Sequence, residues 1–173
     1  MRISRTTSAR WAPALALLVM LTGCGKDKDD AAGAPEVAVK STAALPDLPD
    51  WAKPLMGKTL QDFPTSKACK GAFDVVKVRH AGEKPGVEAA GWAWLTEHKA
   101  APVQLLFADI GGDIVGAGET SIDRPDVPKA LSDVTTTKVG WRGVIRATSG
   151  KITALAALPD RSLCAVGTKD IGG

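Results

Sequence analysis

The sequence is poor in the residues from which enzymes most often build their sites. It has no tyrosine, two histidines and three cysteines, and aromatic residues make up only 5% of the chain. Neither His80 nor His98 stands in a motif such as the G-x-S-x-G elbow, and their spacing to the cysteines does not suit metal ligation. Both are expected to be solvated residues at strand edges. We therefore predict no catalytic residue, no metal site and no cofactor.

The N-terminus also lacks an apolar run long enough to cross a bilayer. Residues 11–21 are apolar except for Pro13, and they follow Arg2, Arg5 and Arg10 with no acidic residue before them. A membrane-spanning helix needs about 20 apolar residues, so this run is typical of a secretion signal. We predict a signal peptide over residues 1–23.

The signal ends in Leu-Thr-Gly-Cys, which resembles the lipobox of bacterial lipoproteins. The resemblance implies cleavage before Cys24 and lipid attachment to it, although an ordinary secretory signal with a chance cysteine is the alternative. Two or more acyl chains anchor a protein stably, so the expected partner of this end is the membrane. The expected location is the periplasmic face of a bacterial cell envelope. An aspartate directly after the cysteine would resemble an inner-membrane retention signal. Gly25 stands there instead, which favours the outer membrane.

Excess charge of one sign is also missing once the signal is removed. The chain has 22 basic and 19 acidic residues, and Arg2, Arg5 and Arg10 account for three of the basic ones. The remaining chain has 19 of each sign. Nucleic-acid binding needs a basic footprint, so no nucleic-acid partner is expected.

Residues 24–60 are predicted to form a flexible, lipidated linker. They begin with a charge cluster and continue with an alanine- and proline-rich stretch that has few large apolar residues. Such a composition buries too little surface to fold alone. Trp51, Leu55 and Met56 mark the point where the chain is expected to dock on the folded body, and residues 61–173 are predicted to form one domain.

That domain is predicted to be all-β, a small antiparallel β-sandwich or barrel with one short helical turn. Short apolar segments alternate with glycine, proline and aspartate turn signals, as is typical of such folds. Pro125 and Asp126 favour the helical turn, because proline is tolerated at the first helical position and an acid suits the first turn. The expected strands are Phe73–Val78, Val87–Leu95, Val103–Ala108, Ile114–Ala117, Val139–Ala147, Ile152–Leu158 and Leu163–Val166.

Cys69 and Cys164 are left over after lipidation of Cys24, and they flank nearly the whole domain. In a compartment that permits disulfides, they are expected to pair. Two buried free thiols are the alternative.

Three motifs follow one another along the domain: Gly-Trp-Ala-Trp at 91–94, Arg-Pro-Asp-Val at 124–127 and Gly-Trp-Arg-Gly at 140–143. Their order resembles small bacterial Ig-like sandwich modules attached to envelope and glycan-related proteins. The resemblance implies a sandwich fold and no single activity, because fold and function separate easily. Leu95 stands where those modules often have an aspartate.

Five residues are candidate ligand or partner contacts. Exposed tryptophans stack on sugars or fill partner pockets. The alternative is that they fill a core otherwise rich in alanine and valine, which we favour for Trp92 and Trp141. The candidate pair Arg124 and Asp126 has its own alternative, a local ion pair that fixes the helical turn, which we favour. The candidates are Trp92, Trp94, Trp141, Arg124 and Asp126.

Two functions follow from these expectations. The first is a non-catalytic envelope lipoprotein that docks onto a protein partner through an exposed sheet edge or apolar patch. The second is a glycan-binding lipoprotein that uses exposed tryptophans. A small envelope hydrolase is a distant third.

Overall fold

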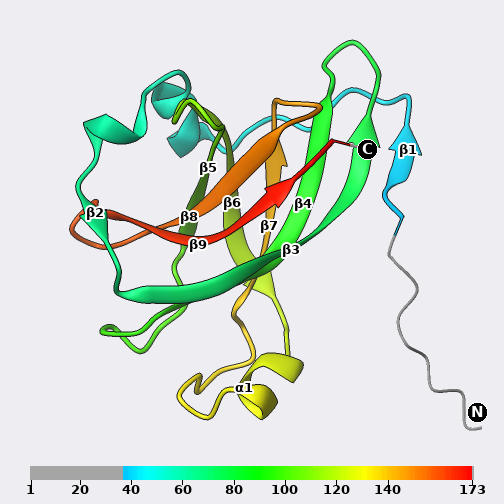
Figure 1. Ribbon diagram of the computed structural model, residues 1–173. Coiled ribbons are helices and arrows are strands. Elements are labelled where there is room, and N and C mark those ends of the chain that lie inside the picture. Colours follow the sequence, from blue (N-terminus) through cyan, green and yellow to red (C-terminus); the bar gives the residue numbers. More distant parts are fainter. Residues whose placement is uncertain (1–36, 173) are drawn as a thin grey trace, which may run out of the picture. The chain divides into compact units, whose positions relative to one another are not determined.

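The computed structural model describes residues 37–172, shown in colour in Figure 1. The predicted signal peptide and the predicted lipidation of Cys24 lie outside these residues. Within the described part of the chain, no helix is long and apolar enough to span a membrane.

The fold is all-β, as predicted, and the nine strands found in residues 37–172 form one continuous sheet in the order β1-β3-β4-β7-β6-β5-β8-β9-β2. Neighbouring strands are antiparallel except at the two ends, where β1 pairs with β3 and β2 pairs with β9 in parallel. The strands are β1 (Val39–Ser41), β2 (Thr65–Ser66), β3 (Cys69–His80), β4 (Gly86–Leu95), β5 (Gln104–Ala108), β6 (Ile114–Ile122), β7 (Gly140–Ile145), β8 (Lys151–Ala157) and β9 (Leu163–Asp170).

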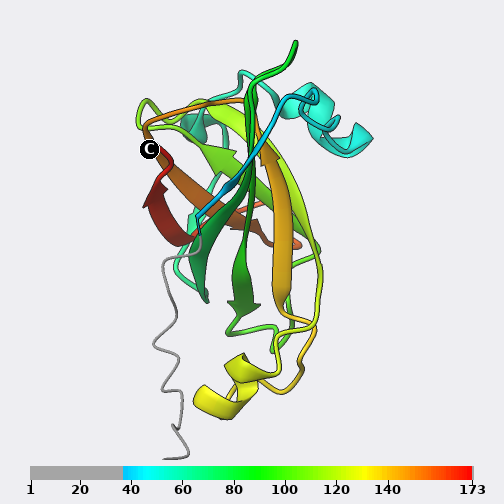
Figure 2. The ribbon, with the colours of Figure 1, turned by 90° about the vertical axis from the view of Figure 1, so that its right-hand side faces the viewer.

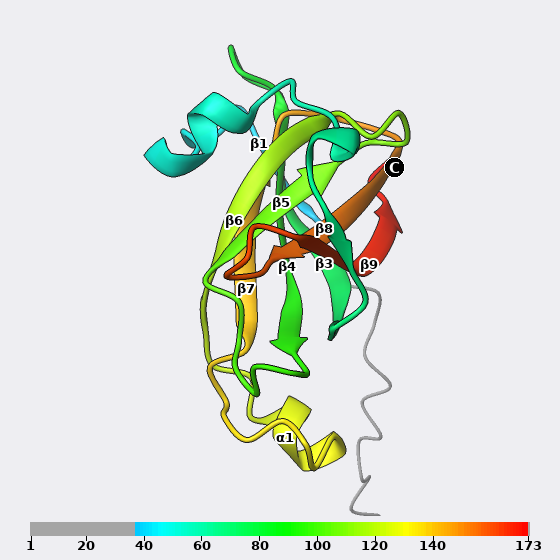
Figure 3. The same cartoon turned by 90° about the vertical axis from the view of Figure 1, so that its left-hand side faces the viewer.

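The sheet curls until β3 and β9, which are separated by five strands in the ladder, lie against each other. In Figures 1 and 3 the red β9 runs beside the green β3. Their backbones approach so closely that a Cβ atom on Gly71 would lie 2.8 Å from Val166 Cβ, and one on Gly167 would lie 2.7 Å from Phe73 N. The result is a sandwich-like fold whose two layers are halves of one sheet.

The space between the layers is filled by an apolar core. Phe73, Phe107 and Trp141 meet at its centre, with ring centroids 5.4 to 6.1 Å apart. Apolar side chains from alternate positions of the central strands surround these three rings. The residues that follow the period-2 pattern in the sequence therefore face the core, as expected. All seven strands predicted from that pattern are present.

The outer face of β5, β6 and β8 is covered by the segment that precedes β2. Leu48 and Ala52 are buried against Leu106 and Leu155, at the start of the short helix η1 (Asp50–Leu55). A second short helix, η2 (Leu60–Asp62), completes the segment.

The folded body therefore begins before the boundary at residue 61 that the composition predicts. Residues 39–60 contain few large apolar side chains, but those few are placed to cover an outer face of the sheet. Trp51, Leu55 and Met56 all pack there, as expected for the docking point. A segment with too few apolar residues to fold alone can still become ordered by packing against an apolar face of the sheet.

The predicted helical turn is α1 (Asp126–Ala130), with Pro125 at its N-cap. It belongs to the β6–β7 connection, whose Val127, Val134 and Val139 bury Trp94 on the outer face of β4. Figure 2 shows α1 and η1 at opposite ends of the sheet.

Candidate functional site

A cleft of about 990 Å³ opens over the middle of β3. Its wall is shaped by two irregularities in the β3–β4 pairing, one between Phe73 and Val75 and the other between Val76 and Val78. Each is a bulge at one residue of β3, the first at Asp74 and the second at Lys77. Such bulges bend a strand and re-aim its side chains, and here both bulged residues line the cleft.

The cleft is strongly cationic, although the whole chain has a formal net charge of only +3. Six basic side chains line it, against two carboxylates, those of Asp74 and Asp170. The basic residues come from four strands, β1, β3, β7 and β9, and from the loop after β6, and the floor between them is apolar. The basic residues are Lys40, Lys77, Arg79, Arg124, Arg142 and Lys169.

Three of these side chains are held in place by hydrogen bonds. Arg79 Nη1 donates to the carbonyl of Ile171 at 2.5 Å, and Lys169 Nζ donates to the carbonyl of Asp74 at 2.7 Å. Arg124 Nη1 donates to Asp74 Oδ2 at 2.5 Å. These contacts fix the rim of the cleft, because each joins groups far apart in the sequence.

Arg124 also forms the local ion pair favoured by the sequence. Its Nε and Nη2 donate to the two carboxylate oxygens of Asp126, at 2.9 and 2.7 Å. The hydrogen bonds from Arg124 hold the pKa of Asp126 below its ordinary value, and those to Asp126 raise the pKa of Arg124. Arg124 lines the cleft whereas Asp126 does not, so only the arginine can also meet a ligand there.

Two basic side chains of the cleft have no acceptor within the described chain. Lys40 and Arg142 are exposed, and neither side chain makes a hydrogen bond or ion pair with another residue of the described chain. Arg142 stands in the middle of β7, opposite Ala90 of β4 and Glu119 of β6. The carboxylate of Glu119 instead accepts a hydrogen bond from Trp51 Nε1 at 2.8 Å.

The tryptophans do not form the exposed platform that glycan stacking requires. Trp94 is 1% exposed and Trp141 is fully buried, so both candidate contacts are core residues. Trp141 fills the interior opposite Gly91, which confirms the interpretation favoured for it, and the β6–β7 connection covers Trp94. Trp92 is half-buried and packs against the same cluster as Trp94.

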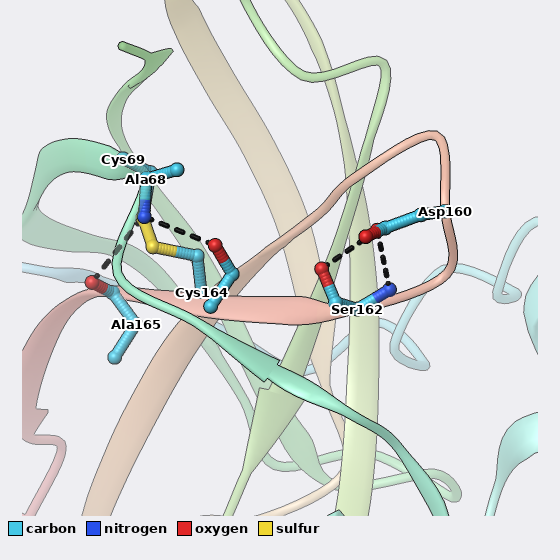
Figure 4. Close-up of a disulfide and its surroundings, with 7 residues drawn as sticks. Ala68, Cys69, Asp160, Ser162, Cys164 and Ala165 are labelled. Atoms are coloured by element: carbon cyan, nitrogen blue, oxygen red, sulfur yellow. Dashed lines mark hydrogen bonds between the residues drawn. A yellow bond between two sulfur atoms is a disulfide. The ribbon is translucent and has the colours of Figure 1, made fainter. Parts of the chain in front are cut away.

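The cysteine pair is confirmed. Cys69 and Cys164 form a disulfide with their Cα atoms 6.1 Å apart, joining the start of β3 to β9 across 95 positions of sequence (Figure 4). The turn before Cys164 is braced by Asp160, whose Oδ1 accepts from Ser162 N at 2.9 Å and from Ser162 Oγ at 2.7 Å. These hydrogen bonds lower the pKa of Asp160.

One histidine was assigned wrongly. His98 is exposed, as expected, but His80 is buried at the end of β3. Its Nε2 lies 2.9 Å from Glu88 Oε1, and its Nδ1 lies 3.1 Å from the carbonyl oxygen of Ala43. The pairing of β1 with β3 brings that carbonyl over the ring, which no local pattern around His80 indicates.

Of the residues that line the cleft, only Arg124 is identified from the sequence as a candidate contact. Its basic residues are scattered from Lys40 to Lys169 and form no charge run. The register of the strands and the two bulges of β3 bring them together.

Taken together, these features define a disulfide-closed all-β domain with a cationic surface cleft. No family model, curated protein or solved structure matches the chain.

Proposed function

We propose that this protein is a lipid-anchored, non-catalytic interaction module of the bacterial cell envelope, and that it docks onto a protein partner. The observation that carries the proposal is the edge strand β1. Within the described chain, β1 pairs only with β3, and its other side carries no strand. Val37 and Val39, at this edge, are 83% and 64% exposed.

An open edge with exposed valines can take up a strand of a partner. Proteins generally blunt such edges with charges, proline or bulges, because unpaired backbone groups template pairing with another chain. Here a single lysine, Lys40, stands in the strand, next to Val39. Addition of a partner strand would satisfy the free backbone groups and cover the two valines.

The membrane half of the proposal rests on the Leu-Thr-Gly-Cys motif. A Cys24→Ser variant should lose metabolic palmitate labelling and leave the membrane fraction or stay unprocessed. A Cys69→Ser variant, which removes a different cysteine, should keep the label. Membrane attachment of unlabelled Cys24→Ser protein would contradict the lipid anchor.

The glycan-binding alternative has lost its main support, because Trp94 and Trp141 are buried. Of the three candidate tryptophans only Trp92 is half-buried, and a single half-buried ring is a poor stacking platform. Quenching of tryptophan emission by envelope oligosaccharides would revive this alternative.

The docking edge can be tested with a photo-reactive residue at position 39 in cells. Position 103 is the matched control, since Val103 is 75% exposed but lies just before β5. We expect one discrete adduct from position 39 and none from position 103. A second substitution, Val37→Lys, places a charge at the same edge and should abolish the adduct. Equal cross-linking from both positions, or none from position 39, would refute the docking edge.

A further inference from the structure

We propose that the cationic cleft beside β1 binds an acidic, extended peptide segment of the docking partner. This inference rests on the proposed function and adds the chemistry of the partner. Three observations carry it: the charge of the cleft, its two basic side chains without an acceptor in the described chain, and its continuity with the open edge.

The lining of the cleft carries a surplus of positive charge. Six basic side chains face two carboxylates, and Asp74 is already engaged by Arg124. The chain after Gly23 has equal numbers of basic and acidic residues, so this surplus is a local concentration of positive charge. A concave surface of one sign focuses the electric field and raises the local concentration of oppositely charged groups.

Arg142 and Lys40 are the groups available to bind. Arg79, Arg124 and Lys169 are held by protein acceptors. Arg142 and Lys40 have no such acceptor in the described chain, and they approach the cleft from β7 and β1. The guanidinium fork of Arg142 matches a carboxylate in bidentate geometry, and such matched pairs give specificity and orientation.

The cleft continues from the open edge of the sheet. Ala38, just before β1, and Lys40, within β1, both line the cleft. Between the cations the lining is apolar, with Val75, Ala90 and Ile122. An extended peptide projects alternate side chains to opposite sides, so one with alternating apolar and acidic residues can use both features.

A calorimetric titration of the full-length chain carrying Cys24→Ser tests this assignment. The probe is the blocked pentapeptide acetyl-Val-Glu-Val-Glu-Val-amide, and the control is its lysine analogue. We expect saturable binding of the glutamate peptide only. Binding should weaken about tenfold in Arg142→Gln, and it should weaken again when salt rises from about 0.05 to about 0.5 M. Arg146→Gln is the matched control, because Arg146 is exposed just beyond β7 and does not line the cleft.

Three outcomes would overturn the assignment: equal binding of both peptides, no binding of the glutamate peptide, or the same affinity in Arg142→Gln. A parallel titration uses vesicles of phosphatidylglycerol. If the vesicles bind with dependence on Arg142 and the glutamate peptide does not, the cleft is a headgroup site instead. Cross-linking from position 39 without peptide binding would reject this inference and leave the proposed function intact. Peptide binding without cross-linking would reject the docking edge alone.

Discussion

Gly91 of β4 and Trp141 of β7 face each other in the core with no room for a side chain at Gly91. A Cβ atom there would lie 2.3 Å from Trp141 Cζ2 and 2.0 Å from the carbonyl oxygen of Ala72. The two residues are directly opposite in the β4–β7 register. The glycine therefore creates the space into which the largest side chain of the core packs.

Gly91→Ala should consequently destabilise the domain. Overpacking of a filled core costs roughly 1–3 kcal/mol, and a backbone oxygen leaves little scope for relaxation. The measurement is the free energy of unfolding from urea titration. Gly111→Ala is the control, because the nearest atom to a Cβ there is Asp109 Oδ1 at 3.3 Å. Equal stabilities of the two variants would contradict this packing.

The earlier start of the folded body gives a second prediction. Leu48 is 3% exposed and lies in the cluster that covers the outer face of β5, β6 and β8. Leu48→Ala should lower the unfolding free energy by about 2–5 kcal/mol, as for buried leucines elsewhere. Val103→Ala, at an exposed position, should change it by less than about 0.5 kcal/mol. If Leu48→Ala behaves like Val103→Ala, residues before 61 do not belong to the stable body.

The disulfide should contribute strongly to stability, because it closes a long loop. Cys69 and Cys164 are 95 positions apart, and the chain-entropy model assigns about 4–5 kcal/mol to a loop of this size. The double variant Cys69→Ala with Cys164→Ala should unfold at a clearly lower urea concentration. Mass measurement after alkylation of the unfolded, unreduced protein gives an independent check, since neither cysteine should react. Free alkylation of both would show that the bond does not form.

The fold was easier to predict than the site. Alternating apolar residues, such as Leu105 and Phe107, are inward-facing because a strand repeats every two residues. β1 and β2 carry no such signal, since each is too short and pairs in parallel with a distant strand.

The site depends on those same distant pairings. His80 contacts Ala43, which follows β1, because β1 pairs with the end of β3. The cleft is lined by Asp74 and Lys77, at the two bulges of β3, beside cations from other strands. Only the Arg124–Asp126 pair, two residues apart, could be predicted from its local sequence. The pattern of a single sequence does not show which strands pair over long distances or in which register, and the site depends on both.

The Arg124–Asp126 pair predicts how acid affects stability. Its hydrogen bonds lower the pKa of Asp126 in the folded protein, so the unfolded chain binds that proton more readily. The pair therefore stabilises the fold at neutral pH, and its contribution is lost as the pH falls below about 4. Asp126 is largely exposed, so solvent screens the pair and its share of the stability is modest.

Urea titrations of the wild type and Arg124→Gln at pH 7 and pH 3 measure this contribution. The wild type should be the more stable at pH 7, and the difference should shrink toward pH 3, because the unfolded chain takes up the proton that the Arg124–Asp126 pair resists in the folded protein. The wild type will still lose stability in acid, because hydrogen bonds also lower the pKa of Asp133 and of Asp160. Arg146→Gln controls for the loss of one positive charge and should follow the wild type at both pH values. A difference of equal size at pH 7 and pH 3 would mean that Arg124 acts through packing and its bond to Asp74, and not through the charge of Asp126.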